Sequence, residues 1–326
     1  MTEFDLIKKY FTDRQPPQSD ISLGIGDDCA LMSPRAGMQL AISTDMLIEG
    51  RHFFQGADAR MLGHKSLAVN LSDLAAMGAT PRAFTLALAL PDIQPDWLRD
   101  FSQGMFDLAD QHQCQLIGGD TTKGPLTISI TVFGEIPIGQ ALRRGAAKEG
   151  DDIWASGTLG DARLALAGYL KQQHLSEEHQ QQAAVRMHMP TPRIALGLAL
   201  RGIAHAAIDV SDGLIGDLNH ILESSDSGAT LWCEALPVGP VLAQHNINLQ
   251  REFALAGGDD YELCFTASSD QRPAVLAAAK QAGTEVTRIG FIEKKKGLPR
   301  LHLLDANNQP INLSLHSFDH FYEPGN

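Results

Sequence analysis

The fold class depends on the segment Leu116-Ile117-Gly118-Gly119-Asp120-Thr121-Thr122 and on Thr127-Ile128-Ser129-Ile130-Thr131-Val132, which follows it. The second stretch alternates polar and apolar side chains with a period of two, as a half-buried strand does. Residues 116–136 therefore predict a strand, a glycine-rich turn and a second strand. One face of the sheet that they form must be covered by other elements.

Strand-like and helix-like segments alternate on both sides of this pair. Residues 39–44 and 84–90 predict strands, and residues 60–77 between them predict a helix. The same alternation continues after residue 150, with strands expected at 206–210, 263–266 and 286–292 and helices expected from Leu214 and across 273–282. This order predicts a mixed α/β architecture.

The length of 326 residues favours two domains of ordinary size, with one very large domain as the alternative. The sequence becomes basic, glycine-containing and less apolar at residues 143–152, as a crossing between domains does. We therefore predict a first domain at residues 1–145 and a second at residues 146–326.

Composition narrows the classes of partner. The formal charge is -13, from 39 Asp and Glu against 26 Lys and Arg, so we expect neither nucleic acid nor an anionic membrane as a partner. The four cysteines show no C-x-x-C spacing, which predicts buried free thiols. Acidic residues near the start and the lack of a run of ~18 apolar residues predict a soluble, cytoplasmic protein.

Five motifs place aspartates beside glycine, at the end of an apolar strand or inside an apolar helix. A single Gly-Asp pair is typical of a turn. Several acids delivered by separate strand ends instead predict a site for more than one magnesium ion, because hard divalent cations prefer oxygen ligands. The motifs are Gly24-Ile25-Gly26-Asp27-Asp28-Cys29-Ala30, Ala41-Ile42-Ser43-Thr44-Asp45, Val69-Asn70-Leu71-Ser72-Asp73-Leu74-Ala75-Ala76-Met77-Gly78, Leu116-Ile117-Gly118-Gly119-Asp120-Thr121-Thr122 and Ile208-Asp209-Val210-Ser211-Asp212-Gly213-Leu214.

Asp73 does not fit a turn, because it lies among Ala and Leu in a predicted helix. We expect its side chain to be largely buried, where a carboxylate requires a cation or a strong donor, and a salt bridge is the alternative. The sequence contains neither a G-x-x-x-x-G-K-[ST] loop nor a kinase-type glycine-rich loop with a following strand lysine. Metal ions are therefore expected to take the place of such a loop at a polyphosphate.

Six motifs together resemble those of the thiamine-monophosphate kinase family: G-I-G-D-D-C-A, S-T-D-M-L, N-L-S-D-L-A-A-M-G-A, L-I-G-G-D-T-T, D-V-S-D-G-L and G-G-D-D-Y-E-L. They follow the family's order from residue 24 to residue 263, and Phe318-Asp319-His320-Phe321 resembles the family's tail. The resemblance implies an α/β (α+β), two-domain aminoimidazole ribonucleotide synthetase-like fold. In that fold an N-terminal mixed sheet with helices binds ATP and magnesium and forms a homodimer, and a C-terminal α/β domain completes the active site.

The resemblance also implies ATP-dependent phosphorylation of thiamine monophosphate to thiamine diphosphate, with several Mg²⁺ ions and ATP as co-substrate. No general base is nominated, because the acceptor phosphate is already largely ionised near neutral pH. Carried over by motif, the magnesium ligands are Asp27, Asp28, Ser43, Thr44, Asp45, Asp73, Asp120, Asp212 and Asp217. ATP is assigned to Gly119, Asp120 and Arg144, and thiamine monophosphate to His52, Glu262 and Phe318. For Arg144, a merely solvated side chain remains the alternative, and for His52 a structural or exposed one.

The sequence departs from the family's pattern at three places. Phe101-Ser102-Gln103-Gly104 lacks the aromatic residue that often flanks adenine, Gly216 replaces a frequent small hydroxyl residue, and Ser317-Phe318 stands where Gly-Tyr is common. Adenine contacts and the stacking residue are left open. Other acceptors within the superfamily, and a noncatalytic nucleotide- or cation-binding module, are the alternatives. Selenophosphate synthetase and the hydrogenase maturation factor are disfavoured because their reactive N- or C-terminal cysteines are missing.

Overall fold

The computed structural model describes residues 2–12, 14–16, 18–295, 297–298, 300–313, 315 and 317–318. The chain folds into two compact units. The first unit comprises Met1–Leu74 and Ala79–Gly139, and the second comprises Ala75–Gly78 and Gln140–Asn326. The domain boundary placed after Gly145 stays a prediction.

A four-stranded sheet forms the centre of the first unit, in the order β3-β6-β4-β5. β6 is antiparallel to both β3 and β4, whereas β5 is parallel to β4. The strands are β3 (Met38–Ile48), β4 (Thr80–Leu90), β5 (Gln115–Lys123) and β6 (Thr127–Pro137). The strands predicted in this half of the chain are confirmed, including the two between residues 116 and 136. The predicted glycine-rich turn was misplaced, because Gly118 and Gly119 lie inside β5 and the turn falls at residues 124–126.

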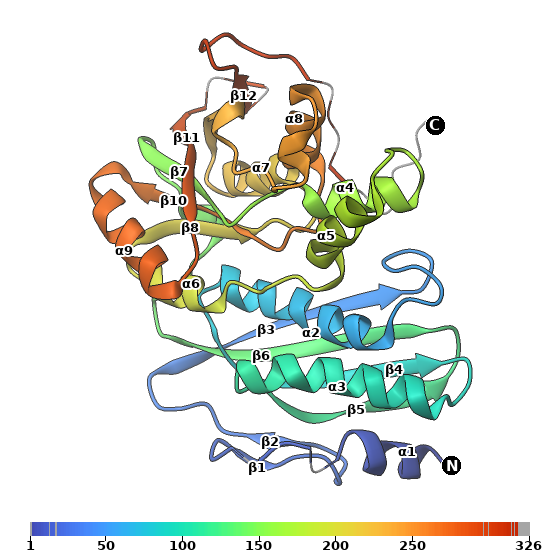
Figure 1. Cartoon of the computed structure of the whole chain (residues 1–326). Coiled ribbons are helices and arrows are strands. Elements are labelled where there is room, and N and C mark those ends of the chain that lie inside the picture. The colour runs from blue at the N-terminus through green and yellow to red at the C-terminus, as the bar shows by residue number, and fades with distance from the viewer. Residues whose placement is uncertain are drawn as a thin grey trace. The chain divides into compact units, whose positions relative to one another are not determined.

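Two helices, α2 (Ala59–Ala76) and α3 (Pro95–Gln111), cover one face of this sheet, as Figure 1 shows. Glycines allow these two helices to touch. A Cβ on Gly63 would lie 2.0 Å from the carbonyl oxygen of Phe101, and one on Gly104 would lie 1.9 Å from that of Arg60. Any larger residue at either position would push the helix backbones apart.

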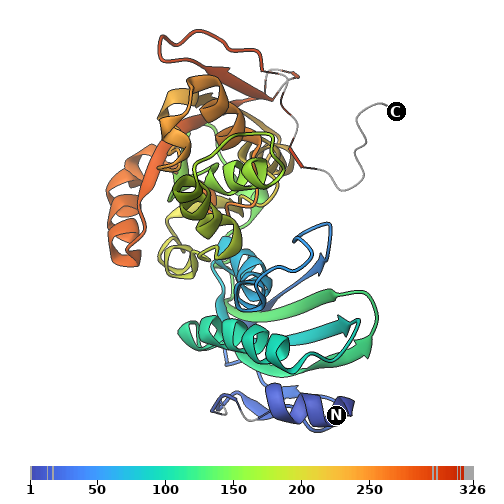
Figure 2. The same cartoon turned by 45° about the vertical axis from the view of Figure 1, so that its right-hand side comes forward.

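The other face of the sheet is partly covered by the two short strands β1 (Ile21–Leu23) and β2 (Leu31–Met32), whereas α1 (Glu3–Tyr10) lies against α3 and the edge strand β5 (Figures 1 and 2). Ile21 packs with Ala83 and Ile117 there. Farther along the same face, the edge strand β3 leaves Ile42 and Met46 exposed, at 59% and 53%. Along β3 the exposed side chains of this half-open face are mainly apolar, with Thr44 between them.

The second unit is built on a six-stranded sheet, in the order β12-β9-β11-β7-β10-β8. Neighbouring strands are antiparallel except for β12 and β9, which are parallel. The strands are β7 (Asp151–Ser156), β8 (Ala204–Asp209), β9 (Ser227–Trp232), β10 (Leu263–Ser268), β11 (Val286–Lys294) and β12 (Leu301–Leu304). The three strands and two helices predicted here are confirmed.

Among the described residues of this unit, the α-helices are α4 (Asp161–Tyr169), α5 (Glu177–His188), α6 (Ile194–Ala199), α7 (Leu214–Ser224), α8 (Ile247–Ala256) and α9 (Arg272–Ala282). Leu218 and Leu222 of α7 pack against Ile153 and Ile208 of the sheet in the main core. α9 lies on the other side of the sheet (Figure 1). No helix within the described residues is both long enough and apolar enough to cross a bilayer.

Candidate functional site

Ser43 and Asp73 form a direct contact between two of the predicted ligands in the first unit. The Ser43 hydroxyl donates a short hydrogen bond to Asp73 Oδ2, which joins β3 to α2. The backbone N–H of Asp45 donates to Oδ1 of Asn70 over 3.1 Å, and Asn70 lies one turn before Asp73 on the same helix. The structure thus brings Ser43, Asp45 and Asp73 to one side of the sheet.

Asp73 is half-buried, so the expectation of a largely buried carboxylate was too strong. The side chain is only half-buried because the strand that it faces lies at the edge of the sheet. α2 presents Asp73 to β3, which is an edge strand of the sheet, and solvent therefore reaches the contact from beyond the edge. The Ser43 hydroxyl supplies one of the donors that such a carboxylate needs.

Thr44 and Asp120 face the other side of the sheet. The Thr44 hydroxyl lies 2.8 Å from Oγ1 of Thr131, and Asp120 is in register with exposed Ala87. Because β3 and β5 are the two edges, three strand spacings of ~4.8 Å, or about 14 Å, separate Asp45 from the Asp120 row. One copy of this unit therefore does not unite Thr44 and Asp120 with Ser43 and Asp45, and their role as ligands stays a prediction.

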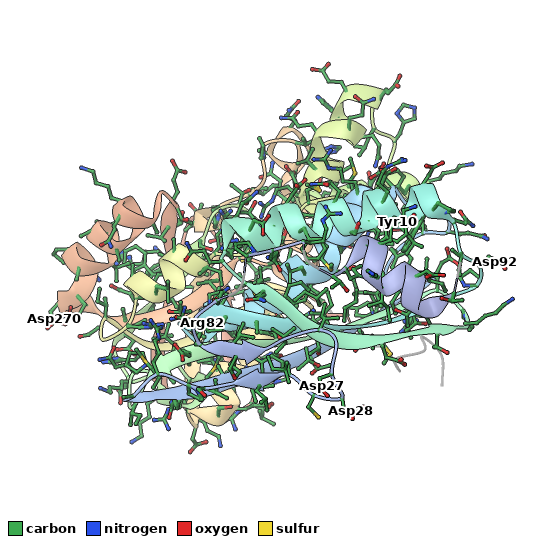
Figure 3. The ribbon with its side chains drawn as sticks, turned by 90° about the horizontal axis from the view of Figure 1, so that it is seen from below. Tyr10, Asp27, Asp28, Arg82, Asp92 and Asp270 are labelled. Atoms are coloured by element: carbon green, nitrogen blue, oxygen red, sulfur yellow. The ribbon has the colours of Figure 1, made fainter. Side chains whose placement is uncertain are left out.

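The paired acids Asp27 and Asp28 lie in the connection between β1 and β2, where both are exposed (Figure 3). The N–H of Asp28 donates to Oδ1 of Asp27 over 2.9 Å, as expected in a tight turn. His52 accepts the Ile48 N–H at Nδ1 over 3.0 Å. In a neutral ring this hydrogen bond leaves the proton on Nε2, which can then donate to a ligand.

The predicted nucleotide contacts lie in different units. Gly119 has a φ of +150°, and a Cβ there would lie 1.8 Å from the carbonyl oxygen of Leu86, so only glycine fits beside β4. Arg144 is exposed, and its carbonyl oxygen accepts the hydroxyl of Ser225 over 2.9 Å, which ties its segment to the end of α7. An exposed guanidinium on an anchored backbone can reach a phosphate.

Asp217 shapes the turn that presents Asp212. Its Oδ2 accepts the backbone N–H groups of Ser211, Asp212 and Gly213 over 3.0, 3.1 and 3.1 Å. Burial raises the pKa of Asp217 to about 7, and the nearby negative charge of Asp212 adds to the effect. One oxygen of Asp217 is thus committed to the loop, so the contact that the structure shows for this residue is structural.

Phe318 lies beside the same turn. Its N–H donates to the carbonyl oxygen of Asp212 over 3.0 Å, and its side chain is 48% exposed. A Cβ on Gly216 would lie 2.5 Å from the hydroxyl of Ser317, so the departures at these two positions accommodate each other. The remainder of the tail motif, residues 319–321, lies outside the described residues.

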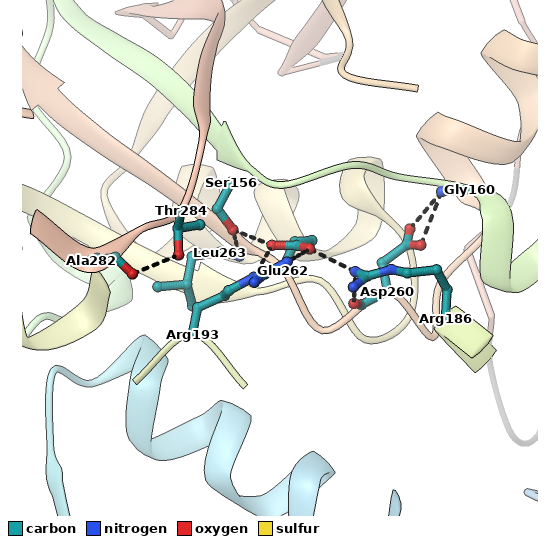
Figure 4. A network of polar contacts seen from close by, with 9 residues as sticks. All are labelled: Ser156, Gly160, Arg186, Arg193, Asp260, Glu262, Leu263, Ala282 and Thr284. Atoms are coloured by element: carbon teal, nitrogen blue, oxygen red, sulfur yellow. Dashed lines mark hydrogen bonds and ion pairs between the residues drawn. The ribbon is translucent and has the colours of Figure 1, made fainter. Parts of the chain in front are cut away.

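Glu262 is fully buried in a polar cluster (Figure 4). Its two oxygens accept four donors: Ser156 Oγ at 2.5 Å, Arg186 Nη2 at 2.6 Å, and Arg193 Nε and Nη2 at 2.7 and 2.5 Å. A predicted substrate ligand thus lies between two guanidinium groups. Its assignment to thiamine monophosphate stays a prediction.

Sequence reasoning missed Asn70, Arg186 and Arg193. Asn70 is a polar residue within the apolar helical motif at residues 69–78, and it is buried in the structure. That position in the sequence could have identified it. The arginines flank Pro190-Thr191-Pro192, about 70 residues before Glu262, and no local pattern connects them with it.

The cysteine prediction is confirmed at three of four positions. Cys114, Cys233 and Cys264 are buried free thiols, and burial raises the pKa of Cys233 to about 11. Cys29 is exposed, so the prediction was wrong there, because its motif forms a surface turn and not a core segment.

The predicted ligands are oxygen atoms only, which suits magnesium better than zinc or copper. Within the described residues, no three acidic, histidine or cysteine side chains converge as a complete metal site. Two parts of the predicted set are assembled within the described residues: the Ser43–Asp73 contact with Asp45 on the same side of the sheet, and the pair Asp212 and Asp217 in the second unit.

Comparison with known proteins gives a consistent result. The profile described as AIR synthase related protein, N-terminal domain, matches residues 26–136, and the corresponding C-terminal domain profile matches residues 148–299. Thiamine-monophosphate kinase of Escherichia coli O157:H7 is 44% identical over 325 residues, which cover 99% of this chain and 99% of that protein.

Solved structures agree. The crystal structure of thiamine-monophosphate kinase from Stenotrophomonas maltophilia K279a is 49% identical with a TM-score of 0.82, and the match covers 88% of this chain and 92% of that chain. The structure of AaThiL complexed with AMPPCP and TMP is 28% identical with a TM-score of 0.76, covering 89% of each chain. The predicted two-domain, mixed α/β fold is confirmed.

Proposed function

This chain belongs to the thiamine-monophosphate kinase family, and on that premise we propose that it phosphorylates thiamine monophosphate with ATP. The γ-phosphoryl group passes to an oxygen of the acceptor phosphate, which forms thiamine diphosphate and leaves ADP. The observation that carries the proposal is the match to thiamine-monophosphate kinase over 99% of both chains. The related AaThiL structure, complexed with AMPPCP and TMP, supports the same pair of substrates.

The protein has little proton chemistry to perform in this reaction. The acceptor phosphate has a second pKa near 6, so at neutral pH its attacking oxygen is already mostly ionised. We therefore assign no general base. The barrier arises from bringing two anions together, and the chain contributes by orienting them and by supplying cationic donors such as Arg144.

We propose Mg²⁺ ions as the cofactor, held by the oxygen ligands predicted from the motifs. In the first unit, Asn70 orients the backbone at Asp45, and Ser43 orients the carboxylate of Asp73, so these groups are already placed by hydrogen bonds. When bound, magnesium would screen the charge between donor and acceptor phosphates. We expect chelation of divalent cations to abolish turnover and added Mg²⁺ to restore it.

The test of this function uses purified protein, Mg²⁺ and ATP labelled in its γ-phosphoryl group, with either thiamine monophosphate or thiamine as acceptor. We expect label in thiamine diphosphate, and only when the monophosphate is supplied. Label appearing from thiamine instead would indicate a different acceptor specificity. No transfer to either acceptor would refute the proposed activity.

A homodimer is the second part of the proposal. Leu40, Ile42, Met46 and Ile48 alternate along β3 and are all exposed on one face of an edge strand. Apolar faces of this kind are typical of an interface. We propose that the open sheet face of the first unit pairs with that of a second copy, and that the protein acts in the cytoplasm.

A further inference from the structure

The hydrogen-bonding capacity of Glu262 is already used. A carboxylate has about four lone-pair sites, and Ser156, Arg186 and Arg193 together donate four hydrogen bonds to it. The side chain is 0% exposed, and a Cβ on Gly157 would lie 2.2 Å from Oε1. Among the described residues, the groups that donate to this carboxylate all belong to the second unit.

The main chain beside Glu262 connects this cluster to the Asp212 turn. The N–H of Val210 donates to the carbonyl oxygen of Glu262 over 2.7 Å, and the N–H of Tyr261 donates back to the carbonyl oxygen of Val210 over 2.9 Å. One residue farther on, the N–H of Asp259 donates to the carbonyl oxygen of Ser211 over 2.7 Å. Three main-chain hydrogen bonds therefore couple the 210–213 turn to the 257–262 loop.

The 257–262 loop is also strained. Asp259 and Tyr261 have φ angles of 62° and 51°, in the left-handed region that non-glycine residues seldom adopt. Gly258 has a φ of 67°, and a Cβ there would lie 2.7 Å from the carbonyl oxygen of Ser211. Strain of this kind persists only where the surroundings over-determine the backbone, and it is typical of functional loops.

We propose that Arg186 and Arg193 are positioning residues for the phosphoryl transfer. They clamp Glu262, and through the paired loops they set the place of Asp212, a predicted magnesium ligand. Arg186 also donates to the carbonyl oxygen of Asp260 over 3.1 Å, so it binds the strained loop at two points. The expected effect on turnover rests on the proposed function. The clamp, meaning the hydrogen bonds from Arg186 and Arg193 to Glu262, is present in the fold whatever the reaction.

The chain contains a matched control. Arg272 donates Nε and Nη2 to the buried carboxylate of Asp152 at 2.5 and 2.9 Å, in the same two-pronged geometry that Arg193 makes with Glu262. Arg288 completes a two-arginine cluster there as well. Asp152 lies near the start of β7, and none of its hydrogen bonds reaches the 210–213 turn. Arg272→Lys thus measures the general effect of loosening a two-pronged arginine–carboxylate pair, here with an arginine that is 45% exposed where Arg193 is 17% exposed.

The experiment compares Arg193→Lys, Arg186→Lys and Arg272→Lys, since lysine keeps the charge but loses the fork. Two quantities are measured: hydrogen exchange at the amides of residues 210–213 and 259–261, and the Mg²⁺ concentration that gives half-maximal activity. For Arg193→Lys we expect both to rise roughly tenfold while the KM for thiamine monophosphate stays within about twofold. Arg272→Lys should change neither the hydrogen exchange nor the Mg²⁺ requirement, even if its melting temperature falls as far as that of Arg193→Lys.

Equal effects from Arg193→Lys and Arg272→Lys would overturn the proposal, because they would reflect lost stability alone. A rise in the KM for thiamine monophosphate, with exchange at residues 210–213 unchanged, would also overturn it and would place Glu262 against the acceptor. If Arg193→Lys does not fold, Arg186→Lys, which loses a single-nitrogen contact, decides the question. If the wild-type protein fails to phosphorylate thiamine monophosphate, the proposed function is refuted. The hydrogen-exchange data would still test whether Arg186 and Arg193 hold residues 210–213 and 259–261 in place.

Discussion

Asp73 shows how much one charge matters at the residue scale. Asp73→Asn keeps an oxygen that can accept the Ser43 hydroxyl but removes the negative charge that a divalent cation needs. We expect turnover of thiamine monophosphate to be abolished while the thermal unfolding midpoint stays close to that of the wild type.

Asp107→Asn serves as its control, because Asp107 forms an exposed ion pair with Arg60 in the same unit, and such pairs contribute about 1 kcal/mol or less. This variant should keep full activity. An active Asp73→Asn enzyme would contradict the metal assignment.

Asp161 gives a prediction of pH dependence. It is buried and accepts the N–H of Leu242 over 2.8 Å, and burial raises its pKa above the ordinary value of 3.8. Between that value and the higher folded pKa, the unfolded chain releases its proton and the native carboxyl keeps it, so stability falls as pH rises. Asn can accept the same N–H and has no proton to lose. In urea unfolding between about pH 4 and about pH 7, the free energy of unfolding of Asp161→Asn should therefore fall less with rising pH than that of the wild type. Parallel curves for the two proteins would contradict this.

At the scale of elements, the contact between α2 and α3 depends on two glycines. A Cβ at residue 104 would lie 1.9 Å from the backbone oxygen of Arg60, and backbone atoms cannot rotate away as a side chain can. We expect Gly104→Ala to lower the free energy of unfolding by about 2–4 kcal/mol, despite the better helix propensity of alanine. Asp100→Ala, on the same helix with its side chain 48% exposed, should stay within about 0.5 kcal/mol of the wild type. Denaturant unfolding measures both, and a neutral Gly104→Ala would show that the helices can separate without cost.

At the scale of the whole molecule, the exposed apolar side chains of β3 predict how two copies assemble. Ile42→Asp places a charge at a side chain that is 59% exposed in a single copy, so it should leave each copy folded and separate the dimer. Sedimentation velocity should show a dimer for the wild type and a monomer for this variant. Leu276→Asp, on α9 with 55% exposure, is the control and should leave the dimer intact. A monomeric wild type would contradict the proposed assembly.

The sequence by itself determined which strands and helices form in both units. The period-two alternation at residues 127–132 is a local pattern that β6 confirms, and Asp212 follows the end of β8 as predicted. Asp45 and Asp120 instead lie inside β3 and β5, because those strands continue beyond the apolar stretches that predicted them. Local patterns are sufficient here because side-chain direction within one strand or helix is set by neighbouring residues.

Only the tertiary structure decided the partners of these residues. Thr44 and Asp45 are adjacent in sequence but point to opposite faces of β3, and Glu262 meets two arginines from about 70 residues away. Strand order and long-range packing bring such groups together or keep them apart, and neither is encoded in the spacing of a motif. A buried carboxylate must find its counter-charges wherever the folded chain supplies them.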